Sequence, residues 1–446
     1  MVEQHSKTQL DADDFDNRKL IKALGKGVKG SRSLNFAEAS HLIRAFANGE
    51  LSSTQMAAAM MLMRVRGESV EELAGVASGL KQLVGKEWQD LNADIDWPVY
   101  AGKREQLPWL LLAAKTIARK GQTIILHGDS QSLPHRRHVE SFISALDIPR
   151  CFTAEQAKVN LAKTGIIYVN SADIVPVLND CRRLHQELGL RSLIQMSVRC
   201  INPTNAPFSL RSYFHPGLDE QHQQVAMLLA EQQACDTLAK QHADIAIFKG
   251  LQGETEINPR VSTSVKLLRF GASGDKQTLE LNHVDLPTQL EAFVGAKVGQ
   301  SDLPAYLLAQ LWHGEDIAES ELTDGQLQQA MASITATVAL VKMLSTPSLA
   351  IDTALTYASK SWLCRNNVAQ LNKLSIHNAH QFDTSENGIN NQQLTCSEHV
   401  GWADEQQNDI QQEFISGNSD FNPICETAYD HSSSREYQSK QREVRT

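Results

Sequence analysis

Three short apolar runs, each bounded by glycine or asparagine, constrain the fold most strongly. They read TIILHG at residues 123–128, GIIYVN at 165–170 and DIAIFKG at 244–250, and helical segments separate them. A continuous apolar run of this length is typical of a strand buried on both faces, and strands that alternate with helices form parallel sheets. The run SVKLLRFG at 264–271 is a fourth candidate strand. We therefore predict a mainly parallel α/β domain over residues 91–374.

A different pattern precedes the strands. Three pairs of residues have the types and spacing of capping boxes, in which side chains satisfy the free amides of a first helical turn: Asn35 with Glu38, Ser52 with Gln55, and Ser69 with Glu72. Apolar residues follow each pair at intervals of three and four, and Gly49 and Gly67 stand where C-terminal caps belong. These signals predict a small N-terminal all-α domain over residues 21–90, joined by helices from about 172–190, after a flexible segment 1–20.

The acidity of the chain is concentrated at its end. Residues 375–446 hold 12 acidic and four basic side chains, a net charge of −8 out of −10 for the whole chain, and they are rich in Asn, Gln and Ser. With few apolar residues at a regular period, such a segment buries too little surface to offset the entropy of ordering. We predict a disordered tail. A short partner-binding helix around residues 402–414 is the alternative.

Several classes of protein are not indicated. The seven cysteines are scattered without a CxxC pair, which argues against a zinc site or a disulfide framework. The first 20 residues lack the apolar core of a signal peptide, and no membrane-length apolar run is present, so we expect a cytoplasmic protein without a membrane partner. His215, Asp219 and His222 have the spacing of metal ligands, but Pro216 and Gly217 interrupt them, and we predict a solvated loop there.

Basic side chains gather at two places in the predicted α/β domain. Lys103 and Arg104 lie after residues 95–100, and four more basic or imidazole side chains lie beyond the run at 123–128. The latter are His135, Arg136, Arg137 and His138. Open α/β sheets bind ligands in the crevice at the carboxyl ends of their strands, so both clusters are candidates to bind a phosphate-bearing small molecule or nucleic acid. The alternative is that they are solvated ends of helices.

Several segments together resemble one enzyme family. They are the helical start from LIRAFANGELSS to ELAGVASGLKQ, the ILHG at 125–128, the LGLRS at 188–192, and the INPTNAP at 201–207. From about residue 21 to 374 the chain resembles the anthranilate phosphoribosyltransferase family, which shares its fold with the pyrimidine nucleoside phosphorylases, a glycosyl transferase family. The resemblance implies a transferase fold, phosphoribosyl pyrophosphate as substrate, and a homodimer formed through the helical domain.

The phosphate-binding motifs of that family are altered here. Where the family has a glycine-rich GTGGD loop, this chain has Gly102, Lys103 and Arg104, whose side chains hinder the close approach of backbone amides to pyrophosphate. Where the family has KHGNR, only His127 and Gly128 match, because Leu126, Asp129 and Ser130 replace the other three residues. This exchange removes two cations and adds an anion where phosphates are expected.

The metal and acceptor positions are altered too. Of the Asp-Glu pair that the resemblance implies for Mg²⁺, Glu256 remains and Thr255 replaces the aspartate. The arginine expected to face the anthranilate carboxylate corresponds to His185, with Arg182 and Arg183 one helical turn earlier as substitutes. Asn202 completes the candidate acceptor site. A subgroup of the family that has lost its catalytic motifs, and that is associated with nucleic-acid binding, resembles this chain more closely.

Three functions remain open at this point. The first is a phosphoribosyltransferase-like protein whose remodelled site binds a phosphate-bearing ligand, with ordinary anthranilate transfer weakened or lost. The second is a non-catalytic, nucleic-acid-binding homodimer that uses basic loops. The third is an active glycosyl or phosphoribosyl transferase. The candidate phosphate or nucleic-acid ligands are Gly102, Lys103, Arg104, His127, Gly128, His135, Arg136 and Arg137.

Overall fold

The structure is a computed structural model. It describes residues 15–27, 29–104, 106–131, 135–234, 243–273, 276–290 and 303–366. The predicted tail, residues 375–446, and the first 14 residues lie outside this described part. The prediction of a flexible start is wrong for residues 17–20, because they belong to helix α1 (Asn17–Gly25) and Leu20 is buried against the helical core.

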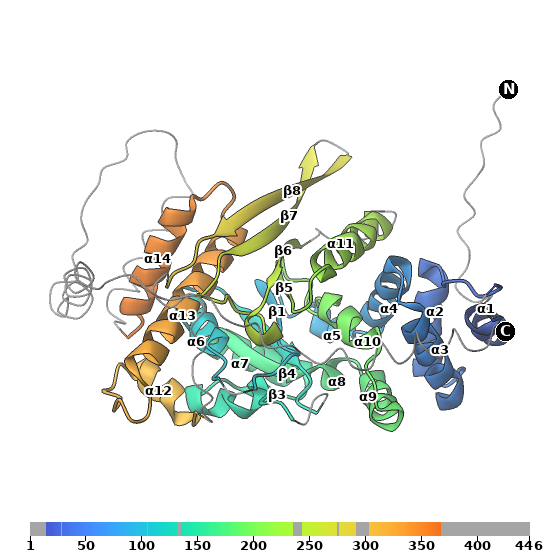
Figure 1. Cartoon of the computed structure of the whole chain (residues 1–446), viewed down its shortest axis with the longest axis horizontal. Coiled ribbons are helices and arrows are strands. Elements are labelled where there is room, and N and C mark those ends of the chain that lie inside the picture. Colours follow the sequence, from blue (N-terminus) through green and yellow to red (C-terminus); the bar gives the residue numbers. More distant parts are fainter. Residues whose placement is uncertain are drawn as a thin grey trace, which may run out of the picture. The chain divides into compact units, whose positions relative to one another are not determined.

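An all-α domain opens the chain, as predicted (Figure 1). After α1 it contains α2 (Phe36–Ala47), α3 (Ser53–Arg66), α4 (Val70–Gln82) and α5 (Lys86–Gln89). The three predicted capping boxes are all confirmed, at Asn35, Ser52 and Ser69. Gly67 ends α3 with a φ of +87°, a conformation that side chains with a Cβ rarely adopt. The predicted boundary at residue 90 falls between α5 and the first strand.

Eight strands form one sheet in the described part of the chain. In spatial order they are β3 (Arg150–Cys151), β4 (Ile166–Asn170), β2 (Ile124–Gly128), β1 (Ile95–Pro98), β5 (Phe208–Tyr213), β6 (Asp244–Lys249), β7 (Thr263–Ser273) and β8 (Lys276–Leu286). The first six are parallel, and β7 and β8 add an antiparallel hairpin at one edge. The sheet is therefore mainly parallel, as predicted, and the carboxyl ends of its parallel strands meet at one edge.

Helices cover both faces of the sheet. One apolar core joins the sheet to α6 (Leu110–Ala118), α12 (Tyr306–His313), α13 (Asp324–Ser345) and α14 (Ile351–Leu363). Figure 1 shows α13 and α14, in orange, beside α6. By length and composition α13 passes as a membrane span, but 72% of its most apolar window is buried inside the protein. This burial is what a core helix of a folded domain shows.

The opposite face of the sheet shares its core with the all-α domain. That core includes Ile125 and Val169 of the sheet together with the apolar faces of α2, α3 and α4. The helices between these parts are α7 (Ala154–Thr164), α8 (Ser171–Ile174), α9 (Val177–Leu188), α10 (Ile194–Ser197) and α11 (Leu218–Ala234). Short 3-10 turns complete the chain at η1 (Val139–Ser141), η2 (Ile143–Leu146), η3 (Val198–Cys200) and η4 (Leu251–Gly253). The predicted joining helices, 172–190, correspond to α8 and α9, and α9 packs on α3.

Candidate functional site

A cavity of about 420 Å³ lies between the all-α domain and the carboxyl ends of the parallel strands. Tyr100 follows β1, Asp129 follows β2, Ser171 follows β4, and Phe214 follows β5, so four strand ends contribute to its wall. Helices α3, α9 and α10 supply the facing side. The cavity therefore occupies the crevice in which open α/β sheets bind ligands. We call it the arginine pocket, after the six arginines in its lining: Arg64, Arg104, Arg136, Arg182, Arg191 and Arg199.

The loop that replaces the family's glycine-rich cradle has no amide to offer a ligand. The amide of Gly102 donates to the buried carboxylate of Glu254. The Lys103 amide donates to the Arg137 carbonyl at 2.8 Å, and the Arg104 amide donates to the Gln252 Oε1 at 3.0 Å. All three N–H groups are used inside the protein, so the loop does not form the anion-binding nest that pyrophosphate requires.

Lys103 and Glu256 form a fully buried ion pair beneath this loop. Both side chains are 0% exposed, and the Lys103 Nζ also donates to the Leu251 carbonyl at 3.1 Å. The other carboxylate oxygen of Glu256 accepts the amide of Leu110 at 2.7 Å. Burial raises the pKa of Glu256, and the charge of Lys103 opposes that rise. The prediction that Lys103 binds phosphate is therefore corrected, because its ammonium lies in the protein interior.

The same contacts remove Glu256 from the candidate metal ligands. Both of its oxygens are engaged, and the hydroxyl of Thr255, where an aspartate was expected, donates to the Pro98 carbonyl at 2.5 Å. Within the described residues no three His, Cys, Asp or Glu side chains lie together in a way that suits a metal ion. The residues present do not fit the Mg²⁺ that the resemblance implied.

His127 belongs to a buried hydrogen-bond network under the arginine pocket. Its Nε2 lies 2.9 Å from Asp96 Oδ1, its Nδ1 lies 2.7 Å from the Tyr100 hydroxyl, and Ser209 donates to the other Asp96 oxygen at 2.7 Å. Because an ionised carboxylate only accepts, Nε2 carries the proton and Tyr100 donates to Nδ1. Both ring nitrogens are used, so His127 holds the Tyr100 ring in place instead of contacting phosphate as predicted.

Four of the pocket arginines have no carboxylate partner among the described residues. They are Arg104, Arg136, Arg191 and Arg199. Burial lowers the pKa of Arg136, and the charges of Arg104 and Arg191 lower it further. Burial likewise lowers the pKa of Arg199 and of Arg191. Guanidinium groups that destabilise one another in this way create a strongly positive potential inside a partly desolvated cavity.

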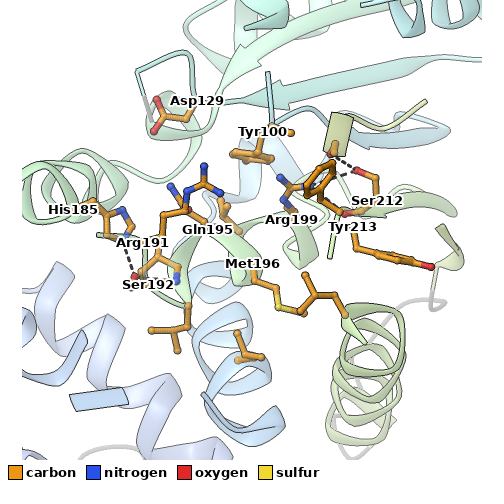
Figure 2. Close-up of a pocket in the computed structure, with 18 of the residues that line it drawn as sticks. Tyr100, Asp129, His185, Arg191, Ser192, Gln195, Met196, Arg199, Ser212 and Tyr213 are labelled. Atoms are coloured by element: carbon orange, nitrogen blue, oxygen red, sulfur yellow. Dashed lines mark hydrogen bonds between the residues drawn. The ribbon is translucent and has the colours of Figure 1, made fainter. Parts of the chain in front are cut away.

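Figure 2 shows how these groups surround the cavity. Arg191 and Arg199 approach the ring of Tyr100 from below, with Gln195 between them. The Arg199 guanidinium lies 5.8 Å from the centre of the Tyr100 ring and donates to the Ser212 carbonyl at 3.1 Å. Reasoning from sequence missed both arginines. The only signal for Arg191 was its place in the LGLRS motif, which was interpreted as a fold signal.

The structure places only some of the predicted acceptor residues in the arginine pocket. Arg182 lines the pocket, where it pairs with Asp129 at 2.6 Å, whereas Arg183 is exposed on α9 and pairs with Asp180 at 3.0 Å. His185 lines the pocket and lies 2.6 Å from the Ser192 hydroxyl, and burial lowers its pKa to about 4. These contacts bring Arg182 and His185 into the site and leave Arg183 on the surface.

Asn202 is also outside the pocket lining. Its side chain accepts the Ala206 amide at 2.9 Å and donates to the Ala206 carbonyl at 2.8 Å. Its φ is +39°, so the residue shapes the loop after η3. The candidate acceptor role of Asn202 is therefore replaced by a structural one.

The two basic loops lie side by side. An antiparallel backbone bridge joins Lys103 to Arg137. Arg136 faces the pocket, whereas Arg137 donates to the Leu303 carbonyl at 2.5 Å and stacks on Phe142, and His135 is exposed outside the pocket lining. Gly128 has a packing role, because a Cβ there would lie 2.4 Å from the Val99 carbonyl. Of the predicted cluster, Arg104 and Arg136 face the pocket.

Comparison with known proteins agrees with the architecture. Residues 18–83 match the helical bundle domain of a glycosyl transferase family. Among curated proteins, the anthranilate phosphoribosyltransferase of Burkholderia cenocepacia is 23% identical over 273 residues, which are 61% of this chain and 75% of that protein. The corresponding protein of Burkholderia mallei is 22% identical over 281 residues, which are 63% and 78% of the two chains.

Solved structures show the same likeness at the level of the fold. Anthranilate phosphoribosyltransferase from Thermus thermophilus has a TM-score of 0.57 at 16% identity, covering 81% of this chain and 99% of its own. The enzyme from Saccharomyces cerevisiae, in complex with PRPP and Mg, has a TM-score of 0.56 at 13% identity, covering 81% and 97%. The resemblance that the sequence motifs predicted is therefore confirmed: this chain is similar in sequence to anthranilate phosphoribosyltransferases and has their fold.

Proposed function

We propose that this protein binds a phosphate-bearing ligand in the arginine pocket through side chains, and that ordinary anthranilate transfer is weakened or lost. One observation carries the proposal. At the crevice where the fold places ligands, Arg104, Arg136, Arg191 and Arg199 surround a cavity without carboxylate partners among the described residues. Cations collected in this way favour an anion, because each guanidinium lowers the stability of its charged neighbours until a counter-charge binds.

The loss of transfer chemistry follows from the loop at residues 102–104. Phosphoribosyl transfer needs a cradle for pyrophosphate and a metal that screens its charge as the leaving group departs. Here the amides of the loop are bonded to Glu254, Arg137 and Gln252, and the remaining metal carboxylate, Glu256, neutralises Lys103. Binding through arginine is retained in this arrangement, whereas stabilisation of a departing pyrophosphate is not.

Arginine suits this task because its planar guanidinium pairs with two oxygens of one phosphate. Arg104 and Arg191 are exposed and Arg136 is half-buried, so these three form the mouth of the pocket, which is where a phosphate first meets the protein. Deeper in the pocket, the Tyr100 ring and the Gln195 amide offer a flat apolar surface and neutral hydrogen-bonding groups. The expected ligand thus places its phosphate at the mouth and an uncharged body against Tyr100.

Calorimetry with phosphoribosyl pyrophosphate tests the proposal. We expect binding that persists when Mg²⁺ is replaced by EDTA, because both oxygens of Glu256 are engaged within the protein and no three described His, Cys, Asp or Glu side chains lie together. Arg136→Met is expected to weaken binding by about tenfold or more, since it removes a charge-assisted contact. Arg183→Met is the matched control, because Arg183 is an exposed arginine whose partners are Asp180 and Glu187.

Two results contradict the proposal. Absence of heat at millimolar ligand excludes the binding function. Formation of phosphoribosyl anthranilate at a rate typical of an enzyme, when anthranilate and Mg²⁺ are added, excludes the loss of transfer and supports the third function considered, an active transferase.

Nucleic-acid binding is the second candidate, and an exposed aromatic side chain favours it. Phe214 lines the pocket with 47% of its surface exposed, beside His215 at a ring distance of 5.0 Å. Aromatic rings next to arginines are typical stacking platforms for single-stranded nucleic acid. We expect affinity for single-stranded RNA or DNA to fall steeply with salt and to fall with Phe214→Ala. Affinity unchanged by Phe214→Ala and by Arg136→Met excludes this candidate.

The homodimer remains a prediction of the resemblance. If the nucleic-acid candidate is correct, a dimer doubles the number of arginine pockets that one strand can contact. Light scattering with and without an oligonucleotide measures that stoichiometry directly.

A further inference from the structure

The last strand of the sheet has an outer edge that no other described strand covers. β8 stands at the end of the strand order and pairs with β7 over its 11 residues. At about 3.4 Å per residue, a strand of this length extends for about 37 Å. The backbone N–H and C=O groups on its outer side therefore have no strand to bond among the described residues.

Part of the β7–β8 hairpin extends beyond the rest of the sheet (Figure 1). β6 pairs with residues 265–268 of β7, so residues 269–273 of β7 have only β8 as a neighbouring strand. Two strands alone are marginally stable in water, whereas three or more with an apolar face are stable. A further strand along β8 supplies what this part of the sheet lacks.

Two large apolar side chains are exposed along β8. Leu279 is 38% exposed and Leu281 is 37% exposed, and the register places them opposite Phe270 and Leu268 of β7. Leu268 is buried in a small apolar core with Ala226 of α11, and Phe270 packs against that core. The apolar face of the hairpin thus continues from this core to the exposed edge of the sheet. Such an edge is a template for pairing with another strand.

The order of residues in β8 favours pairing with a second copy of the same strand. The strand reads KQTLELNHVDL, and Leu281 stands at its centre. In an antiparallel pair with a two-fold axis at Leu281, all 11 residues of each copy are paired and the two Leu281 residues are opposite each other. Glu280 then lies opposite Asn282 of the second copy, whose amide donates to the carboxylate, and no two residues of like charge are opposite.

The neighbouring registers are less favourable. Opposite residues share a face of the sheet, so the two-fold axis moves from one residue to the next. An axis at Glu280 places two carboxylates opposite each other, which is destabilising, and an axis at Asn282 places Leu279 opposite Asp285. The register centred on Leu281 is therefore favoured over both.

We propose that the edge of β8 is an interface between two copies of this chain, formed by antiparallel pairing of the two strands about Leu281. The 8-stranded sheet of one copy then continues into the sheet of the second. This interface lies in the α/β domain, so it is separate from the homodimer that the resemblance implies for the helical domain. It does not depend on a ligand in the arginine pocket, and each proposal can fail without the other.

Disulfide cross-linking of the full-length protein tests the register. Opposite residues of an antiparallel pair have Cα atoms about 4.5–5.5 Å apart, which suits a disulfide. Leu281→Cys is therefore expected to form a covalent dimer with oxidised glutathione, and dithiothreitol is expected to reverse it. Mass spectrometry of the linked peptides separates this bond from any link through the native cysteines.

Asn282→Cys is the matched control. The two copies of residue 282 are displaced by two positions along the strands, so their Cα atoms are about 8 Å apart, too far for a disulfide. Neither Asn282→Cys nor Glu280→Cys alone is expected to cross-link. A mixture of these two proteins is expected to cross-link, because residues 280 and 282 are opposite each other.

Light scattering measures the association without a cross-link. Leu281→Lys places two ammonium groups opposite each other at the axis, and it is expected to lower the weight-average mass about twofold at a protein concentration of about 50 µM. Val159→Lys is the control, because Val159 is an apolar residue that is 68% exposed on α7, and the mass is expected to stay unchanged. If Leu281→Lys does not fold, the cross-linking result decides alone.

The other outcomes overturn the proposal. Absence of a Leu281→Cys dimer excludes the interface, whether β8 is covered by another part of this chain or by a different protein. A mass unchanged by folded Leu281→Lys excludes it as well. Cross-linking of Asn282→Cys to itself, at the yield of Leu281→Cys, contradicts the antiparallel register.

Discussion

Two groups of buried polar side chains contact Tyr100, one through His127 and the other through Arg199, and they differ in one respect. Beneath the loop at residues 102–104, Lys103 pairs with Glu256, and His127 bonds to Asp96 and Tyr100. In the pocket wall, Arg199 and His222 have no ion pair with any described carboxylate. We call the first group the floor and the second the wall.

This difference indicates what each group is for. A buried charge whose partners are all within the protein contributes to one fixed structure, and removal of either partner exposes the cost of the other. A buried charge without a partner lowers stability in the free protein and is offset only by a ligand. The floor is therefore structural, and we propose that the wall is directed at a ligand.

The largest expected effect on the stability of the protein comes from a substitution in the floor. Glu256→Ala leaves the Lys103 ammonium buried without a counter-charge and the Leu110 amide without its acceptor, and it is expected to destabilise the protein by about 3–5 kcal/mol, measured by thermal and urea denaturation. In the double variant Lys103→Met with Glu256→Gln, the glutamine still accepts the Leu110 amide and no lone charge remains. We expect it to recover more than half of the loss. A Glu256→Ala protein as stable as the wild type contradicts the structural role of the floor.

The next largest expected effect is the change of protein stability with pH. It depends on two histidines of the pocket lining, His185 and His222. His185 and His222 have folded-state pKa values of about 4 and about 3, below the usual 6.5 of histidine. Between pH 6.5 and 4.5 the unfolded chain therefore binds protons that the folded protein does not, so stability falls as pH falls, by about 3 kcal/mol for the two groups. His222→Gln is expected to flatten this dependence.

Two acidic groups with lowered pKa values titrate below this window, whereas burial raises the pKa of Glu256 and of Asp173, and proton uptake by these two in the folded state opposes the fall in stability. The Arg32 hydrogen bond holds the pKa of Glu38 below its usual 4.5, and the Lys266 hydrogen bond does the same for Asp219 below 3.8. The stability that these two carboxylates contribute is present above those values and is lost only below them. A His222→Gln protein with the same pH dependence as the wild type contradicts the neutral, buried state of His222.

The floor and the wall also differ in how far sequence could predict them. Capping boxes at Asn35, Ser52 and Ser69 depend on contacts three residues apart, so the all-α domain was predicted from local chemistry alone. Strands β1 and β5 were missed, because Asp96 in one and Arg211 in the other interrupt the apolar pattern of a buried strand. Asp96 is tolerated there because it belongs to the floor, where it bonds to His127 and Ser209.

Within the site, sequence predicted the place and not the direction of the side chains. The crevice at the strand ends was predicted, and the structure has a cavity there, where a backbone bridge also joins the loops at 102–104 and 135–138. Lys103 and Arg104 are neighbours of like charge, but one is buried against Glu256 and the other faces the cavity. That choice depends on Glu256, 153 residues away from Lys103, and no local pattern contains it.

Tyr100 contacts both groups, because its hydroxyl bonds to His127 in the floor and its ring faces Arg199 in the wall. Removal of the hydroxyl therefore tests to which group it belongs. Tyr100→Phe removes the donor to His127 Nδ1 and leaves the ring against the pocket. We expect a loss of about 1–2 kcal/mol in stability, because His127 Nδ1 is left buried without a partner, and a change of less than about twofold in the affinity for phosphoribosyl pyrophosphate. A tenfold loss of affinity without a change in stability would instead show that the hydroxyl serves ligand binding, as we propose for the wall.

The smallest effect on stability is expected at the mouth of the pocket, at Arg104. Its side chain is exposed and has no ion pair with the described carboxylates, and the bond from its amide to Gln252 does not depend on side-chain type. Arg104→Met is therefore expected to change the free energy of unfolding by less than about 0.5 kcal/mol, while removing a charge that repels Arg136. Affinity for ribose 5-phosphate falls about fivefold at low salt, and by less at 1 M salt, where an exposed charge is screened within about 3 Å. A stability loss above about 1 kcal/mol would mean that the exposed Arg104 side chain supports the loop, as the floor does. The distinction between structural charges and ligand-directed charges would then be contradicted at Arg104.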